Sequence, residues 1–339
     1  MFVLRRNRAL AVLTAAAGAA VLLAGCTSQP DGEAEPDAPA SPDTVRLVTH
    51  DSFVLSEGLV EDFEKESGFT VEVNKAGDAG ALANELVLTR GAPLGDVVFG
   101  VDNTFASRVT DAGVIDGDLR PVDKGDVCVN ADKAWFREQN LPVPETLDDL
   151  ADPRYQGLLV VTNPASSSPG LAFLLATVGA YGESGFGDYW GALVENDVKV
   201  VDSWEDAYFV DFSGSEGKGD RPLVLSYSTS PASTVTDDGE STTTALLDTC
   251  FRQEEYAGVL EGAANPEGAQ KFVDFLLGEQ VQADLPGSMY MYPADDDVEL
   301  PAEWVEHAPL AEDPHQVAPE EIAENRDAWI EAWTSIVLG

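Results

Sequence analysis

The alternation of short apolar runs with amphipathic segments, which begins at Val45, limits more than any other feature how this chain can fold. Apolar residues at every or every second position predict strands, and apolar residues three or four positions apart predict helices. Strands that alternate with helices favour a mainly parallel sheet with helices on its faces, so we expect an α/β fold. The predicted strands are 45–49, 69–73, 96–99, 158–162, 198–201 and 223–226, and the predicted helices are 57–66, 80–90, 103–112 and 170–181.

Polar loops follow the first three predicted strands, at 50–52, 77–79 and 100–103. In open α/β sheets, ligands bind outside the carboxyl ends of the strands. We therefore expect these three loops to face a binding site.

The second half of the chain carries aromatic residues in three separate loops, at 203–208, 227–231 and 289–293. Aromatic side chains mixed with hydroxyls and carboxylates suit a flat cationic or heteroaromatic ligand, although packing in the core is an equal alternative. Ser167 and Ser168 precede the predicted helix at 170–181. They either cap that helix or contact a ligand.

The N-terminus has the pattern of a secretion signal that ends in a lipobox. Residues 1–25 combine arginines with about fifteen apolar or small residues, and Leu-Ala-Gly precedes Cys26. We expect lipidation of Cys26, and an ordinary signal peptide with an incidental cysteine is the alternative. The segment 26–43 is rich in Pro, Ser and acidic residues and lacks large apolar side chains, which predicts a disordered tether.

The chain is strongly acidic, with 19 Lys and Arg against 61 Asp and Glu. This balance excludes a general role in nucleic-acid binding, which needs a basic surface. It also disfavours contact with an anionic membrane, so we expect attachment through the lipid alone. The acidity either keeps the protein soluble or concentrates a cationic ligand.

Two cysteines remain after Cys26, at positions 128 and 250, and an even pair in an exported protein is a disulfide candidate. The three histidines are scattered, and the sequence contains no Cys-x-x-Cys or His-Glu-x-x-His motif. A nucleophile elbow and a phosphate-binding glycine loop are also missing from it. We therefore predict no metal, no cofactor and no enzymatic activity, although a Cys–His pair brought together by the fold stays open.

Several segments together resemble the thiamine-binding proteins of ABC importers, a subgroup of the extracellular solute-binding proteins. Two of them are fairly specific, the Leu-Ser-Tyr-Ser-Thr-Ser-Pro run and the Gly-Val-Asp-Asn run. The matches occur in order and cover about 45–335. The matching segments are 49–53, 95–103, 168–171, 203–208, 224–231 and 291–293.

The resemblance implies a two-lobed periplasmic-binding-protein-like fold of type 2 with a ligand cleft between the lobes. Lobe 1 would comprise 44–125 and 251–339, and lobe 2 would comprise 126–250. A Cys128–Cys250 disulfide would then join the two segments that cross between the lobes.

The resemblance also implies which residues contact the ligand. Asp102 is added as a second carboxylate beside Asp78, and Tyr290 stands where the family has a tryptophan. The sequence departs further from the family at His50, where a tyrosine is usual, and at Ser233, near which another tyrosine is missing. The implied contacts are Asp78, Ala79, Ser167, Ser168, Trp204, Tyr227, Ser228, Thr229 and Ser230.

We expect a monomeric, lipid-anchored extracytoplasmic receptor that binds thiamine or its phosphates and delivers it to the permease of an ABC importer. One alternative keeps the fold but binds another small cation or a metal, such as a polyamine or ferric ion. The lack of an adjacent Tyr-Tyr pair counts against iron. The other alternative is a secreted thiamine-processing enzyme, for which only Cys128 or Cys250 could be the nucleophile.

Overall fold

The computed structural model describes residues 43–215 and 219–339, which belong to one unit of the chain. The predicted signal peptide (1–25), Cys26 and all but the last residue of the predicted tether (26–43) lie outside these residues. Those expectations therefore stay predictions. In the part that the structure describes, no helix has both the length and the apolar character needed to cross a bilayer.

The described residues form a nine-stranded mixed sheet. Its strands are β1 (Thr44–Thr49), β2 (Thr70–Lys75), β3 (Val97–Asp102), β4 (Ile115–Asp132), β5 (Leu159–Thr162), β6 (Lys199–Val201), β7 (Leu223–Tyr227), β8 (Thr243–Leu260) and β9 (Tyr292–Pro293). The strand order is β2-β1-β3-β8-β4-β7-β5-β6, and β9 pairs with β4. β1 pairs in parallel with β2 and β3, and β5 pairs in parallel with β6 and β7.

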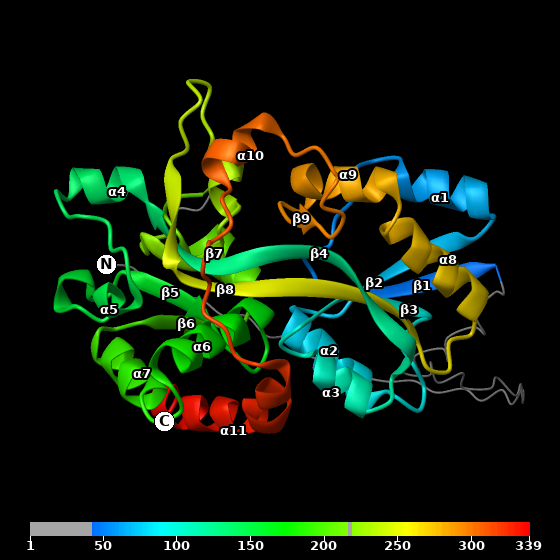
Figure 1. The fold of residues 1–339 in the computed structure, drawn as a ribbon, viewed down its shortest axis with the longest axis horizontal. Helices are drawn as coiled ribbons and strands as arrows, with labels where there is room; N and C mark the ends of the chain where they lie inside the picture. The colour runs from blue at the N-terminus through cyan, green and yellow to red at the C-terminus, as the bar shows by residue number, and fades with distance from the viewer. Residues whose placement is uncertain (1–42, 216–218) are drawn as a thin grey trace, which may run out of the picture. The chain divides into compact units, whose positions relative to one another are not determined.

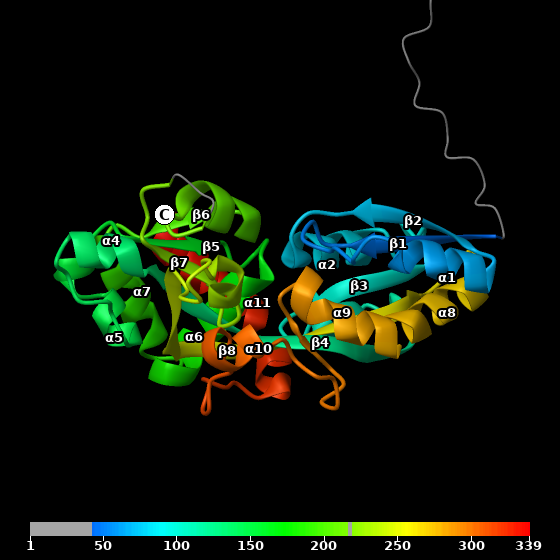
Figure 2. The ribbon, with the colours of Figure 1, turned by 90° about the horizontal axis from the view of Figure 1, so that it is seen from above.

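The expected mainly parallel sheet is present at both ends, but not in the centre. There β8 runs antiparallel to β3 and β4, and β4 runs antiparallel to β7. β4 and β8 contain 18 residues each, about three times the usual strand length. Figures 1 and 2 show them running from one group of elements to the other. They therefore connect two lobes, with β1–β3 in lobe 1 and β5–β7 in lobe 2.

Helices cover the sheet in both lobes (Figures 1 and 2). In lobe 1 the helices are α1 (Leu59–Ser67), α2 (Ala79–Leu88), α3 (Ala106–Asp111), α8 (Pro266–Leu276) and α9 (Glu279–Ser288). The other helical segments are α4 (Lys133–Glu138), α5 (Leu147–Leu150), η1 (Pro153–Tyr155), α6 (Ser168–Tyr181), α7 (Phe186–Glu195), η2 (Asp206–Asp211), η3 (Ser230–Thr234), α10 (Ala302–His307) and α11 (Pro319–Val337).

On one face of the lobe 1 sheet the core lies against α1 and α8, and on the other it lies against α2. Phe63 of α1 packs edge-on against Phe272 of α8, with ring centroids 5.2 Å apart. Val45 and Leu47 of β1 are fully buried in the same cluster. The amphipathic pattern of α1 thus places its apolar face on the sheet, as the sequence predicts.

The last two helices pack against elements of lobe 2, and α11 also reaches lobe 1 through Arg326, whose Nη1 donates to Ser107 at 3.1 Å. Trp333 of α11 meets Trp190 of α7 edge-on, with centroids 5.5 Å apart. Trp304 of α10 is buried with Ala232 of η3. The physical reason is apolar area, because the large side chains of α11 are buried in one cluster with residues of α6 and α7.

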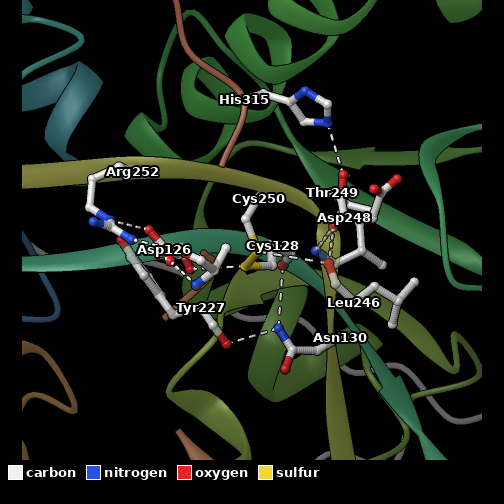
Figure 3. The surroundings of a disulfide bond; sticks show 12 residues. Asp126, Cys128, Asn130, Tyr227, Leu246, Asp248, Thr249, Cys250, Arg252 and His315 are labelled. Carbon is white, nitrogen blue, oxygen red and sulfur yellow. Dashed lines mark hydrogen bonds and ion pairs between the residues drawn. A yellow bond between two sulfur atoms is a disulfide. The ribbon is translucent and has the colours of Figure 1, made fainter. Parts of the chain in front are cut away.

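The structure joins Cys128 of β4 to Cys250 of β8 by a disulfide across 122 positions of sequence (Figure 3). The bond lies where the register of the two strands shifts, between Val127 and Val129. Beside it, Arg252 forms an ion pair with the buried carboxylate of Asp126. The two long strands are therefore fixed to each other at the lobe 2 side of the crossing.

Candidate functional site

A cavity of about 330 Å³ lies between the two lobes. Lobe 1 contributes the loop after β1, the start of α2 and the segment 289–291. Lobe 2 contributes the start of α6 and the loops after β6 and β7. Most of these segments follow the carboxyl ends of parallel strands, where the strand-end rule predicts a site.

Asp78 joins the two lobes at the edge of the cavity. It precedes α2, and its Oδ1 accepts hydrogen bonds from the N–H groups of Ala79 (2.7 Å) and Ser168 (3.3 Å). Its Oδ2 accepts from the N–H of Trp204 at 2.9 Å. Burial raises the pKa of Asp78, and these backbone donors oppose that shift. One carboxyl group therefore accepts hydrogen bonds from backbone N–H groups at the start of a helix in lobe 1 and at the start of helical segments in lobe 2.

A glycine allows the close contact beside Asp78. A Cβ on Gly80 would lie 2.6 Å from the carbonyl carbon of Ser166, which is closer than side chains tolerate. Because Gly80 has no Cβ, the two backbones approach closely enough for the N–H of Ala81 to donate to the carbonyl of Ser166 at 2.9 Å. The lobes are thus in direct contact, and the cavity is in a closed arrangement.

Aromatic rings line the lobe 2 side of the cavity. Trp204 stacks on Tyr208 with centroids 5.1 Å apart and rings inclined by 17°. It also meets Tyr227 edge-on at 6.3 Å, and its indole N–H donates to Ser226 Oγ at 3.0 Å. These contacts fix the orientation of the Trp204 ring, so the ring is preorganised for stacking with a flat ligand.

Tyr290 lies on the lobe 1 side of the cavity and is 36% exposed. Its φ of 55° is in the left-handed region, which a bulky residue rarely adopts. Strained backbone of this kind concentrates at ligand-binding positions. The conformation thus marks Tyr290 as a candidate contact residue.

Carboxyl groups and a histidine gather at the floor of the cavity. Glu255 of β8 lines it, and Glu255 Oε1 lies 3.6 Å from His50 Nε2. Burial lowers the pKa of His50, but the carboxylates of Glu255 and Asp78 together raise it more, so the net shift is upward. Burial also raises the pKa of Asp102 to about 7. A positively charged ligand is favoured here over an anion.

The structure brings most of the predicted site residues to the cavity and leaves three away from its lining. Asp102 accepts from Thr104 Oγ1 at 2.7 Å, Ser167 donates to Thr162 Oγ1 at 2.9 Å, and Ser228 is fully buried. The predicted residues that line the cavity are Asp78, Ala79, Ser168, Trp204, Tyr227, Thr229, Ser230 and Tyr290.

Sequence reasoning missed Glu255 as a lining residue. It lies within a long strand rather than in a loop, and the segment around it is too polar to predict a buried strand. The available signal was the alternation of Phe251, Gln253, Glu255 and Ala257, all of which are buried. The loop 50–52, which the sequence predicts to face the site, lines the cavity, as do parts of the loops 203–208 and 289–293. Besides Glu255, the lining residues outside all the predicted loops and contacts are Pro169, Phe209, Ser215, Ser233 and Thr234.

Within 43–215 and 219–339, no group of three or more His, Cys, Asp or Glu side chains is placed to hold a metal ion. Both Cys128 and Cys250 are in the disulfide, so neither offers a thiol as a nucleophile. The cavity therefore has the aromatic and charged groups of a binding site without a thiol for covalent catalysis.

Residues 99–312 match the family model described as bacterial extracellular solute-binding protein. The chain is 31% identical over 312 residues to the thiamine-binding periplasmic protein of Brucella suis, covering 86% of this chain and 91% of that protein. It is 28% identical over 314 residues to the protein of that name from Escherichia coli, covering 86% and 92%.

A solved structure described as a periplasmic thiamin binding protein superposes with a TM-score of 0.77 at 26% identity, covering 87% of this chain and 96% of that one. The periplasmic binding protein AfuA from Actinobacillus pleuropneumoniae superposes with a TM-score of 0.73 at 14% identity, covering 87% and 98%. The second likeness concerns the fold alone, and both agree with the two-lobed architecture.

Proposed function

Because the chain belongs to the bacterial extracellular solute-binding proteins, we propose that it binds thiamine between its lobes and delivers it to the permease of an ABC importer. The observation that carries the proposal is the combination of aromatic rings and buried carboxyl groups around one cavity. Among the described residues that line it, none is Lys or Arg.

Thiamine has a flat aminopyrimidine and a permanently positive thiazolium, and the cavity offers a partner for each. Trp204, Tyr227 and Tyr290 supply aromatic faces, each contributing about 0.5–2 kcal/mol as a cation–π contact, depending on desolvation. Ser168 and Ser230 place hydroxyls at the cavity wall, where they would contact the pyrimidine. The volume of about 330 Å³ lies within the usual range for small-ligand pockets.

The other candidate functions have less support. Ferric ion or another metal would need a ligand cluster, which the described residues do not form. A thiamine-processing enzyme with a cysteine nucleophile would need a free thiol, whereas Cys128 and Cys250 are bonded to each other. Solute binding without catalysis is the function that these observations favour.

Thiamine binding is tested by identifying the ligand that copurifies with the protein and by titration calorimetry with thiamine. Trp204→Ala and Tyr227→Ala should each weaken binding at least about tenfold, which corresponds to about 1.4 kcal/mol. Val210→Ala is a matched control, because Val210 lies on the same segment as Tyr208, is 61% exposed and does not line the cavity. Unchanged affinity in both main variants would place the ligand elsewhere, and no binding to the parent protein would refute the function.

The proposal includes anchoring outside the cytoplasmic membrane as a monomer, through lipid on Cys26 and through no other part of the chain. The lipobox at 23–26 and the acidic composition support it. Cys26→Ala should release the protein from the membrane fraction. A variant that still sediments with membranes would contradict the lipid anchor.

A further inference from the structure

Three carboxyl side chains stand side by side on neighbouring strands in the middle of the sheet. Asp102 of β3 and Asp123 of β4 both pair in register with Glu255 of β8, which lies between them. Their exposures are 0%, 1% and 4%, respectively. Like charges directly opposite one another destabilise a sheet, and buried charges must be paired or neutralised. This carboxyl row therefore requires protons or a cation.

The protein supplies little positive charge to the carboxyl row. Among the ion pairs of the described residues, only His50 engages it, through Glu255. Both carboxyl oxygens of Asp123 and Oδ2 of Asp102 are buried without a hydrogen-bond partner, and so is His50 Nε2. Gln253 donates to Glu255 Oε1 at 3.2 Å, but its amide is neutral.

Neighbouring residues fix the imidazole ring of His50 in front of the row. A Cβ on Gly100, whose φ is 96°, would overlap this ring, so only glycine leaves room for it. The ring also packs against Phe99 with centroids 5.7 Å apart. His50 and Glu255 both line the cavity, so a ligand reaches the row at this pair.

We propose that the carboxyl row, reached through Glu255, is the subsite for the positive charge of the ligand, and that the bound cation replaces a proton held by His50 and the row. The inference rests on the proposed function, because it takes the thiazolium of thiamine as that cation. Binding then releases protons to the solvent, and affinity falls when the pH is lowered.

The direction of the proton linkage follows from the surroundings of these groups. Glu255 and Asp78 raise the pKa of His50 beyond the lowering by burial, and Lys75 opposes them. Burial and Glu255 raise the pKa of Asp102 to about 7 and that of Asp123 well above its usual range. A permanent cation beside Glu255 repels the imidazolium and favours the carboxylates, so the protons leave.

The charged and titratable groups around His50 come from six elements or their ends. Lys75 donates to the carbonyl of Asp51 at 2.5 Å, at the edge of the site. Burial raises the pKa of Tyr227 well above its ordinary value, so this phenol stays protonated near neutral pH. The groups are Lys75 of β2, Asp78 before α2, Asp102 of β3, Asp123 of β4, Tyr227 of β7 and Glu255 of β8.

Titration calorimetry with thiamine tests the linkage on the unmodified protein. Repeating it near neutral pH in buffers of different ionisation enthalpy gives the number of protons released, which we expect to be about 0.5–1. Between about pH 6.5 and about pH 8.5 the affinity should rise up to about tenfold, which corresponds to a pKa displacement of one unit. Buffer-independent heats and a flat pH profile would refute the inference while leaving thiamine binding intact.

Two variants locate the effect. Glu255→Gln should weaken thiamine binding at least about tenfold at neutral pH, and His50→Gln should lower the number of protons released on binding. Glu254→Gln is the matched control on the same strand, because its side chain accepts from Tyr256 at 3.0 Å and does not line the cavity. If Glu255→Gln does not fold, the proton release and pH dependence measured on His50→Gln and on the unmodified protein still test the inference. Failure of the unmodified protein to bind thiamine would refute the proposed function itself.

Discussion

Replacing Asp78 by Asn tests how strongly the two lobes are held together at the cleft. Asp78 belongs to lobe 1, whereas two of its donors, the N–H groups of Ser168 and Trp204, belong to lobe 2. Asparagine keeps the shape and one acceptor oxygen, but its amide nitrogen cannot accept a hydrogen bond. A hydrogen bond to a charged group contributes about 1.5–3 kcal/mol, so closure should weaken by about that amount.

The weakened closure should appear directly in ligand affinity, because a ligand that binds only the closed form must supply the closure energy. A loss of about 1.5–3 kcal/mol corresponds to about 10- to 150-fold weaker thiamine binding in Asp78→Asn. Titration calorimetry measures the affinity, and small-angle X-ray scattering measures the dimensions with and without thiamine.

The exposed ion pair between Arg108 of α3 and Asp327 of α11, at 3.4 Å, provides a control away from the cavity lining. Exposed ion pairs of this kind contribute little, so Asp327→Asn should change the affinity by no more than about twofold. If Asp78→Asn binds thiamine as tightly as the unmodified protein and gives the same scattering when loaded, Asp78 does not hold the lobes together.

Two further predictions concern stability. Replacing Cys128 and Cys250 by Ser should lower the free energy of unfolding by about 2–5 kcal/mol in urea, because the bond closes a loop across 122 positions; two free thiols in the unfolded, non-reduced protein would contradict the bridge. The ligand-free protein should also lose stability as the pH rises through about 4 to 8. Asp102 and His50 have raised pKa values when folded, so the folded state binds more protons there; an equal pH profile for Asp102→Asn by thermal unfolding would count against this origin.

The ends of the sheet could be predicted from the sequence, but its centre could not. Apolar runs such as 45–49 and 158–162 form buried parallel strands close to their predicted bounds. β4 escaped prediction because its first half carries Gly117 and Pro121 among acidic residues and is largely exposed. Apolar periodicity predicts a strand only when one of its faces is apolar. The first half of β4 is a strand because it pairs with β8, which is distant in the sequence.

The same distinction applies to the site. Trp204 and Tyr227 could be predicted to face a ligand because they follow strand ends, where a local rule applies. Glu255 could not, since a glutamate inside a strand is expected to face water. Its burial beside Asp102 and Asp123 depends on the register of three strands that are distant in the sequence.

The disulfide also has a topological consequence. Cys128 and Cys250 lie close to where the chain enters and leaves lobe 2, so most of that lobe is enclosed in one covalent ring. A protease that cuts the chain once between these two residues therefore releases no fragment. For a protein exposed to proteases outside the cell, a single nick in a lobe 2 loop leaves both pieces attached and able to reassemble around the cleft.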